Sequence, residues 1–361
     1  MVKEQMDSQV FFIQARRDEG DDVISQKTAK IFLKAGFYKK LEPDSLVACK
    51  IHFGEKGNKG HIKPAWLKDI ITQLKKKSRK VFLTDTNTLY VGHRSNSIDH
   101  ILLAEEHGFS LENVNVPVII ADGLVGHDEE EVEINRPRLK TARIASAFLH
   151  SEALICLTHF TGHIQTGFGA SIKNIGMGCA SRAGKLAQHS DVQPWVNTKL
   201  CKNCGICFEY CPVEAIVQKE ESAFILREKC IGCGQCLVVC PTAAVKMRWD
   251  SDSRRIQEKM AEYAYAVKQR FGDKIVFINF LLQITKNCDC MGGTGPAIIE
   301  DIGLLASSDP VAVDAASVEL INRRAGRDLL REKQDIDWSW QLKHGQRIGL
   351  GSLDYELIEI E

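Results

Sequence analysis

The sequence predicts an α/β protein in which a mostly parallel sheet with helices on both faces is interrupted by a small, cysteine-rich α+β domain. Short, continuously apolar runs alternate with longer amphipathic runs along most of the chain, as expected for strands buried between two layers of helices. Eight of the 13 cysteines fall between residues 201 and 240. The alternation resumes after that block, which indicates an insertion into a larger domain.

The chain before the cysteine block is predicted to alternate between strands and helices. The strands are rich in apolar and β-branched residues, and the helices end near glycine or carry proline in their first turn. The predicted strands are 10–13, 45–51, 80–84, 116–121 and 153–158, and the predicted helices are 24–35, 64–77, 95–107 and 139–150.

The chain after the block continues in the same way. We predict a helix at 251–271, strands at 274–280 and 302–306, a helix at 310–324 capped by Asp309, and a closing strand within 353–361. The predicted domains are therefore an α/β domain made of residues 1–190 and 251–361, with an insert at 191–250.

The cysteine block contains two runs of the form C-x2-C-x2-C-x3-C-P that match position by position. This spacing lets one backbone turn present three thiolates to a [4Fe–4S] cluster, while the fourth cysteine ligates a second cluster. Structural zinc is the alternative, but it usually takes its ligands from two pairs of residues. The expected sets are Cys201, Cys204, Cys207 and Cys240 for one cluster, and Cys230, Cys233, Cys236 and Cys211 for the other. The segment resembles a bacterial-type two-[4Fe–4S] ferredoxin domain.

Five candidate catalytic residues lie outside these runs. Cys288 and Cys290 follow a predicted strand and could bind a metal or a substrate or form a redox pair, although a turn with two incidental thiols is the alternative. His159 and His163 follow the 153–158 strand, and Lys173 lies further along the same glycine-rich stretch. Such groups could bind an anion or a metal, or shuttle protons.

Polar residues also follow three other predicted strands. Ligands in open α/β sheets bind beyond the carboxyl ends of strands, so these residues and the five candidates predict a pocket along one rim of the sheet. Cys49 and Cys156 are predicted to be buried and inert, whereas Cys179 could lie near a ligand. The additional rim residues are Lys50, His52, Glu55, Asp85, Thr86, Asn87, His93, Arg94, Asp122, Gly123 and His127.

Several motifs together resemble the DUF362 family of iron–sulfur-centre proteins. They are His159-Phe-Thr-Gly-His163, the stretch from Gly167 through Lys173-Asn-Ile-Gly-Met-Gly-Cys179, the two cysteine runs, Cys288-Asp-Cys290-Met-Gly-Gly, and 301–314. The resemblance covers nearly the whole chain. It implies an α/β domain interrupted by a ferredoxin domain, mostly in anaerobic bacteria and archaea. It implies little about activity, because the family is defined by a domain of unknown function.

Charge and composition argue against nucleic-acid binding, membrane association and secretion. Lysine plus arginine balances aspartate plus glutamate at 47 each, so no general attraction to nucleic acid or to a membrane is expected. No apolar run approaches the roughly 20 residues that span a bilayer, and the first residues lack the apolar core of a secretion signal. Cysteines with metal-ligand spacing favour a reduced, cytoplasmic protein.

The predicted function is electron transfer through two [4Fe–4S] clusters to a small substrate or metal site on the α/β domain. A redox partner protein or a small electron carrier would supply the electrons, and a further metal could lie near Cys288 and Cys290. The protein could thus be a ferredoxin-linked oxidoreductase. The alternatives are a non-catalytic electron carrier or metal-cluster scaffold and, more weakly, a redox sensor.

Overall fold

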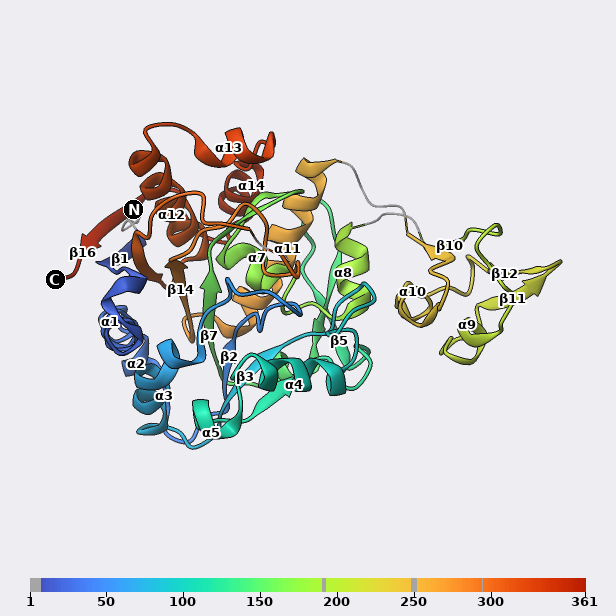
Figure 1. Cartoon of the computed structure of the whole chain (residues 1–361), viewed down its shortest axis with the longest axis horizontal. Coiled ribbons are helices and arrows are strands. Elements are labelled where there is room, and N and C mark those ends of the chain that lie inside the picture. Colours follow the sequence, from blue (N-terminus) through green and yellow to red (C-terminus); the bar gives the residue numbers. More distant parts are fainter. Residues whose placement is uncertain (1–7, 190–192, 248–251, 294) are drawn as a thin grey trace.

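The main body of the protein is built on one eight-stranded sheet, shown in the cartoon of the computed structural model (Figure 1). The structure describes residues 8–189, 193–247, 252–293 and 295–361. The strand order is β16-β1-β15-β14-β7-β2-β3-β4. Only β15 runs opposite to its neighbours, so the prediction of a mostly parallel sheet is confirmed. The strands are β1 (Ser8–Gln14), β2 (Val47–Lys50), β3 (Val81–Asp85), β4 (Val118–Ile120), β7 (Ala153–His159), β14 (Ile275–Leu281), β15 (Gly303–Ser307) and β16 (Tyr355–Glu359).

Helices cover both faces of this sheet, because its central strands bury apolar side chains on both sides. Along β14, Ile275 and Phe277 belong to one core, and Val276 and Ile278 belong to the other. The helices packed against the second core are α1 (Asp21–Lys34), α2 (Phe37–Lys40), η2 (Pro64–Leu67), α3 (Lys68–Lys75), α4 (Ser97–Glu106) and α5 (Leu111–Val114). Those packed against the first are α6 (Ser146–Leu149), α7 (Ser171–Gly176), α11 (Ser253–Phe271), α12 (Pro310–Ala325), α13 (Leu329–Gln334) and α14 (Trp340–Ile348).

Most predicted elements are confirmed, with one clear exception. The predicted helix 139–150 is wrong: residues 141–145 form strand β6 (Thr141–Ala145), and only α6 is helical. β6 pairs antiparallel with β5 (Glu129–Glu133), and Ala142 and Ile144 are buried while Arg143 lies between Glu129 and Glu131. Pairing with β5 and burial of alternate side chains thus make a strand of a segment whose own pattern is ambiguous.

The remaining predictions differ from the structure by small shifts. The predicted helix 64–77 divides into η2 and α3, and Asp309 caps α12 by accepting hydrogen bonds from the Val311 and Ala312 amides. The closing strand is β16, which pairs with β1. The short elements are η1 (Arg17–Glu19), β8 (Thr161–His163), β9 (Gly167–Gly169) and α8 (Arg182–His189). No helix among the described residues has both the length and the apolar character to cross a bilayer.

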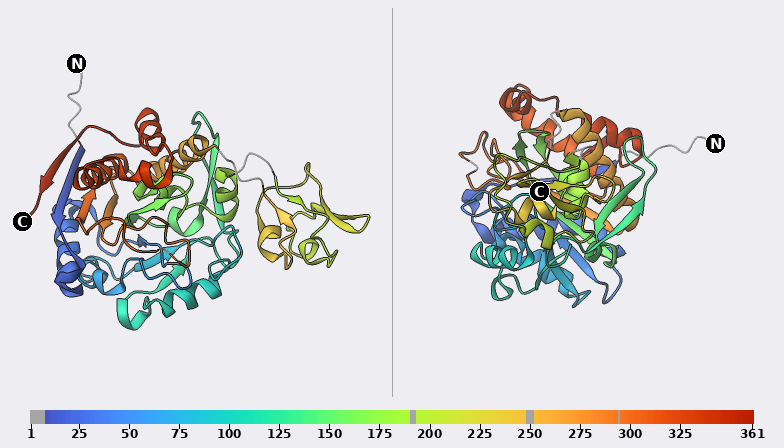
Figure 2. Two further views of the ribbon diagram at one scale, coloured as in Figure 1. Left: turned by 45° about the horizontal axis from the view of Figure 1, so that its top comes forward. Right: turned by 90° about the vertical axis from the view of Figure 1, so that its right-hand side faces the viewer.

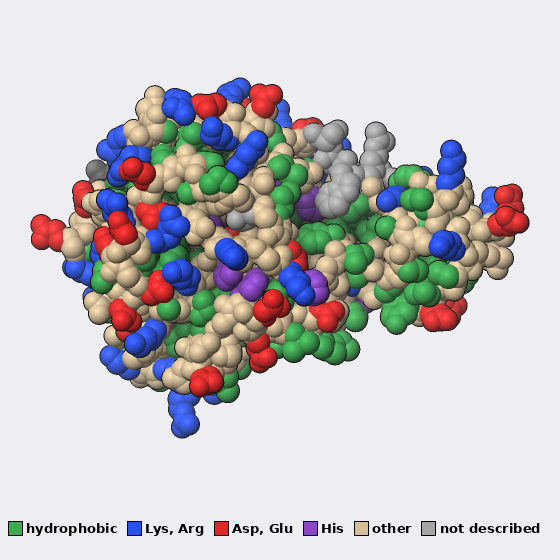
Figure 3. Space-filling view, viewed as in Figure 1, with side chains coloured by type: hydrophobic (Ala, Val, Ile, Leu, Met, Phe, Trp, Pro, Cys, Tyr) green, Lys and Arg blue, Asp and Glu red, His purple; other side chains and the backbone are tan. Residues whose placement is uncertain are grey.

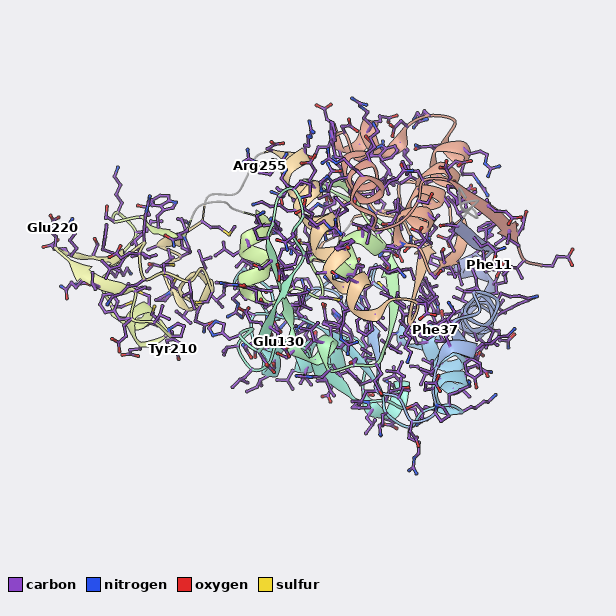
Figure 4. All side chains as sticks on the ribbon, turned by 180° about the vertical axis from the view of Figure 1, so that it is seen from behind. Phe11, Phe37, Glu130, Tyr210, Glu220 and Arg255 are labelled. Carbon is purple, nitrogen blue, oxygen red and sulfur yellow. A yellow bond between two sulfur atoms is a disulfide. The ribbon has the colours of Figure 1, made fainter. Side chains whose placement is uncertain are left out.

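Residues 193–247 form a separate cysteine lobe that projects from the main body (Figures 1 and 2). Tyr210 and Glu220 lie on this lobe, at the opposite end of the molecule from Phe11 (Figure 4). The lobe interrupts the sequence of the main body but not its sheet, because β7, which precedes the lobe in the chain, pairs with β14, which follows it. The elements of the lobe are β10 (Trp195–Val196), α9 (Ile206–Glu209), β11 (Ile216–Lys219), β12 (Ser222–Ile225), α10 (Gln235–Val239) and β13 (Val245–Lys246). The exact domain boundaries fall partly outside the described residues and stay a prediction.

The two halves of the lobe repeat the same backbone conformation. Gly205 and Gly234 precede α9 and α10 at φ values of 79° and 74°, a region that favours glycine. Glu214 and Ala243, which follow the two cysteine runs at matching positions, also have positive φ values of 49° and 48°. The sequence repeat is therefore also a structural repeat.

Candidate functional site

A cavity of about 470 Å³ opens at the carboxyl ends of β2, β3 and β7. The chain runs from β2 to β3 and β4 on one side of β2 and then returns to form β7 on its other side. Such a reversal leaves a crevice beyond the strand ends, where open α/β sheets bind their ligands. The fold therefore places the cavity at the rim that the sequence predicts.

The cavity brings together all five candidate catalytic residues, since His159, His163, Lys173, Cys288 and Cys290 all line it. Not every predicted rim residue joins them. Asp122 and His127 follow β4 and do not line the cavity, and Cys179 is fully buried beside the lining residues Met177 and Gly178 without lining it itself. Cys49 and Cys156 are buried, as predicted. The predicted rim residues that line the cavity are Lys50, His52, Asp85, Thr86 and Arg94.

His159 and Asp289 join the end of β7 to the loop that follows β14. His159 Nδ1 lies 2.8 Å from Asp289 Oδ2, and Nε2 lies 2.9 Å from the Leu282 carbonyl oxygen. Both ring nitrogens therefore face acceptor oxygens and donate hydrogen bonds to them. Burial opposes the charge on this ring, but the Asp289 carboxylate raises the pKa of His159 above its usual value. His159 is engaged in holding the loop.

A tight turn brings the sulfur atoms of Cys288 and Cys290 together as a disulfide. The Met291 amide donates to the Cys288 carbonyl at 3.1 Å, which closes the turn. A nitrogen of His163 and both sulfur atoms lie within 4.8 Å of one another. The loop thus bends so that the two sulfur atoms converge.

The His163 ring is oriented by Thr166. The Gln165 backbone amide donates to His163 Nδ1 at 3.3 Å, and the Thr166 hydroxyl, which donates to the Phe168 carbonyl at 2.7 Å, lies 3.0 Å from the same nitrogen. Both contacts are made at Nδ1 and fix the orientation of the ring. Burial, followed by the charge of Lys173, holds the pKa of His163 well below its usual value, so the ring is neutral at pH 7.

Two lysines at the cavity make no ion pair with a carboxylate among the residues that the structure describes. Lys50 pairs with Asp85 at 3.0 Å, and Arg94 pairs with Glu55 at 3.1 Å. Lys173 makes no hydrogen bond or ion pair with any residue that the structure describes. Within the described part of the chain, Lys185 donates to the Thr86 hydroxyl and the Ala180 carbonyl. The cavity therefore carries an excess of positive charge.

Burial changes the pKa of both unpaired lysines. It lowers the pKa of Lys173 to about 8, helped by the charge of Arg94, and it lowers the pKa of Lys185 to about 8 although Asp122 opposes the shift. An anion in the cavity would favour the charged form of both groups. Lys185 is not identifiable from the sequence, because α8 was not predicted and a single lysine in a polar stretch carries no signal of burial.

Two smaller cavities within the cysteine lobe divide its eight cysteines into two sets. One is lined by Cys201, Cys204, Cys207 and Cys240, and the other by Cys211, Cys230, Cys233 and Cys236. In each set, the fourth cysteine comes from the other cysteine run. The Ala215 and Ala244 amides donate to the sulfurs of Cys211 and Cys240 at 3.2 and 3.1 Å, so the two exchanged cysteines have matching environments.

The cysteine lobe contacts the main body beside the second cysteine set. Gly234 follows Cys233, and a Cβ placed on it would lie 2.9 Å from Leu89, a residue that lines the main cavity. The buried Arg182 crosses the junction by donating to the Gln235 side chain and, at 3.2 Å, to the Thr88 carbonyl. Figure 3 shows hydrophobic side chains over this junction. A small apolar cluster there contains Leu89, Leu186 and Met247, with Leu237 packed against it.

Comparison with known proteins adds a family but no activity. Residues 47–319 match the family model described as "Domain of unknown function (DUF362)". A comparison with curated protein sequences gives no match.

Two solved structures have a similar arrangement. One is the lactate racemase apoprotein from Thermoanaerobacterium thermosaccharolyticum, with 12% identity, a TM-score of 0.46 and 90% of this chain covered. The other is a protein from Thermotoga maritima, with 8% identity, a TM-score of 0.44 and 85% of this chain covered. The chain spans 59% of the length of each. Because the family model matches well over half of the sequence, this chain belongs to the DUF362 family.

Proposed function

We propose that this protein binds two [4Fe–4S] clusters in its cysteine lobe and transfers electrons to a small anionic substrate in the main cavity. The observation that carries the proposal is the contact between Gly234, beside the second cysteine set, and Leu89, which lines the cavity. It supports an order in which the set of Cys211, Cys230, Cys233 and Cys236 is the nearer one to the substrate. The set of Cys201, Cys204, Cys207 and Cys240 would then receive electrons from a redox partner.

The residues of the lobe suit iron–sulfur clusters. Each small cavity gathers four thiols, and [4Fe–4S] clusters are held by four cysteine thiolates. Amide hydrogen bonds to the sulfurs of Cys211 and Cys240 would stabilise thiolate charge and tune the reduction potential. The clusters would supply one-electron transfer.

The main cavity is large enough for a small anion and carries positive charge. Lys173 and Lys185 contribute positive charge that no described carboxylate balances through an ion pair. Such cations, held in a partly buried site, attract a carboxylate or phosphate group more strongly than they would at the surface. We assign Lys173 and Lys185 to substrate binding. His159 is a positioning residue, because its ring is engaged with Asp289 and the Leu282 carbonyl.

Purification under anaerobic conditions tests cluster binding. We expect about eight iron and eight sulfide per chain, and an electron paramagnetic resonance signal of reduced [4Fe–4S] clusters after treatment with dithionite. The control is Cys49→Ala, which removes a buried thiol far from the lobe and should leave both counts unchanged. About two zinc ions per chain with no sulfide would contradict the proposal and favour structural zinc.

A further inference from the structure

We propose that Cys288, Cys290 and His163 form a metal site in the main cavity, and that the site can bind an ion only when the Cys288–Cys290 disulfide is reduced. The inference deepens the proposed function and rests on it in one respect, since the clusters would supply the electrons. The site would take a borderline or soft divalent ion such as Zn²⁺ or Ni²⁺. It is separate from the two cysteine sets of the lobe.

The three ligand atoms already lie close enough to share one ion. A nitrogen of His163 and the sulfur atoms of Cys288 and Cys290 lie within 4.8 Å of one another. Tetrahedral ligands that bind zinc at about 2.0 to 2.3 Å are separated by distances below this limit. Two thiolates and an imidazole are a donor set for borderline and soft ions. Cys288 is 5% exposed, so the ion would be largely shielded from bulk water.

Neighbouring residues hold both parts of the site in place. Tyr90 donates to the Cys290 carbonyl at 3.2 Å, and Asn58 donates to the Met291 carbonyl at 3.0 Å. Asp289, between the two cysteines, pairs with His159. On the other side, the Gln165 amide and the Thr166 hydroxyl both contact His163 at Nδ1 and hold its ring in place. The cavity wall is thus organised before an ion binds.

The disulfide makes the site depend on redox state. Reduction breaks the sulfur–sulfur bond with two electrons and two protons, which gives the thiols of Cys288 and Cys290. Binding of a divalent ion releases the same two protons, because thiolates are the ligands. One electron from each cluster would supply the pair. In the oxidised form neither sulfur is a thiolate, so only His163 remains as a strong ligand.

Three protein ligands would leave one coordination position open toward the cavity. A tetrahedral ion with three protein ligands can take water or substrate in the fourth position, as in catalytic zinc sites. Lys173 and Lys185 line the same cavity and would attract an anion to that position. The site would therefore join the two features of the cavity, its positive charge and its paired sulfurs.

The test measures metal retention in the anaerobic holoprotein. One portion is treated with tris(carboxyethyl)phosphine and one is left oxidised, and both are incubated separately with Zn²⁺ and Ni²⁺ and desalted. We expect about one ion per chain in the reduced portion, with sulfur and nitrogen neighbours in its X-ray absorption spectrum, and almost none in the oxidised portion. Cys288→Ser, Cys290→Ser and His163→Ala should each lower retention at least about tenfold.

Two controls separate this result from trivial causes. Cys49→Ala and His150→Ala remove a buried thiol outside the cavity and an exposed imidazole, and both should retain metal as the unchanged protein does. Iron is counted in every sample, so a folded variant with intact clusters is recognised. Retention of neither ion by the reduced protein, equal retention after oxidation, or equal retention by Cys288→Ser would overturn the inference. Because the phosphine opens the disulfide without the clusters, such a failure leaves the iron count and the proposed function untouched.

Discussion

Replacing Cys211 and Cys230 together by alanine should leave one intact [4Fe–4S] cluster, whereas replacing Cys211 and Cys201 together should leave none. Cys211 and Cys230 line the same small cavity, so the first pair removes two ligands from one set and none from the other. Cys201 lines the second cavity, so the second pair damages both sets. Iron analysis and the spin count of the reduced [4Fe–4S] signal measure the number of intact clusters.

The two double variants are each other's control, because each lacks two cysteines of the same lobe. We expect about four iron and about one spin per chain for Cys211→Ala with Cys230→Ala, and no signal of an intact four-cysteine cluster for Cys211→Ala with Cys201→Ala. If each run instead held its own cluster, the two results would be exchanged. That outcome would show that the fourth cysteines do not cross between the sets.

Anion binding in the main cavity should weaken sharply above pH 8. Lys173 and Lys185 have pKa values of about 8, so both carry charge below that pH and lose it above. If one charged lysine is required, affinity should fall about tenfold per pH unit above 8, and about a hundredfold if both are required. Calorimetric titration with oxalate and with inorganic phosphate between pH 6.5 and 9.5 measures this dependence.

Substitution of the same lysines tests whether they cause the effect. Lys173→Met and Lys185→Met keep an apolar stem of similar length, and each should weaken anion binding at pH 7 about tenfold or more and reduce the pH slope. Lys68→Met is the matched control, since the Lys68 side chain is 68% exposed on the surface. An affinity that does not change with pH or with either cavity substitution would mean that these lysines do not bind the anion.

The fold was largely predictable because most of its strands are buried on both faces. Continuous apolar runs such as those of β7 and β14 read as strands without knowledge of their partners. The error at residues 139–150 has the opposite cause. β6 is buried on one face only, its structure depends on pairing with the acidic strand β5, and no local pattern identifies that partner.

The candidate site was predictable where the chemistry lies at strand ends. His159 is the last residue of β7 and the Cys288 loop follows β14, so parallel pairing of these strands brings both to the same rim. Residues that reach the cavity from elsewhere were missed. Lys185 lies on α8, and Leu89 reaches Gly234 through packing of the lobe on the main body. Such contacts depend on tertiary structure, and periodicity and spacing do not report them.

The central claim is that electrons pass from the lobe to the main cavity, and chemical labelling of Cys288 and Cys290 tests it most directly. The anaerobic holoprotein is reduced briefly with dithionite and desalted. It is then quenched with acid at intervals and alkylated for mass spectrometry. We predict that both thiols appear as the clusters become oxidised, and that they do not appear when Cys211→Ala and Cys230→Ala remove the nearer set. Persistence of the disulfide beside reduced clusters, or equal thiol formation in that variant, would contradict the account.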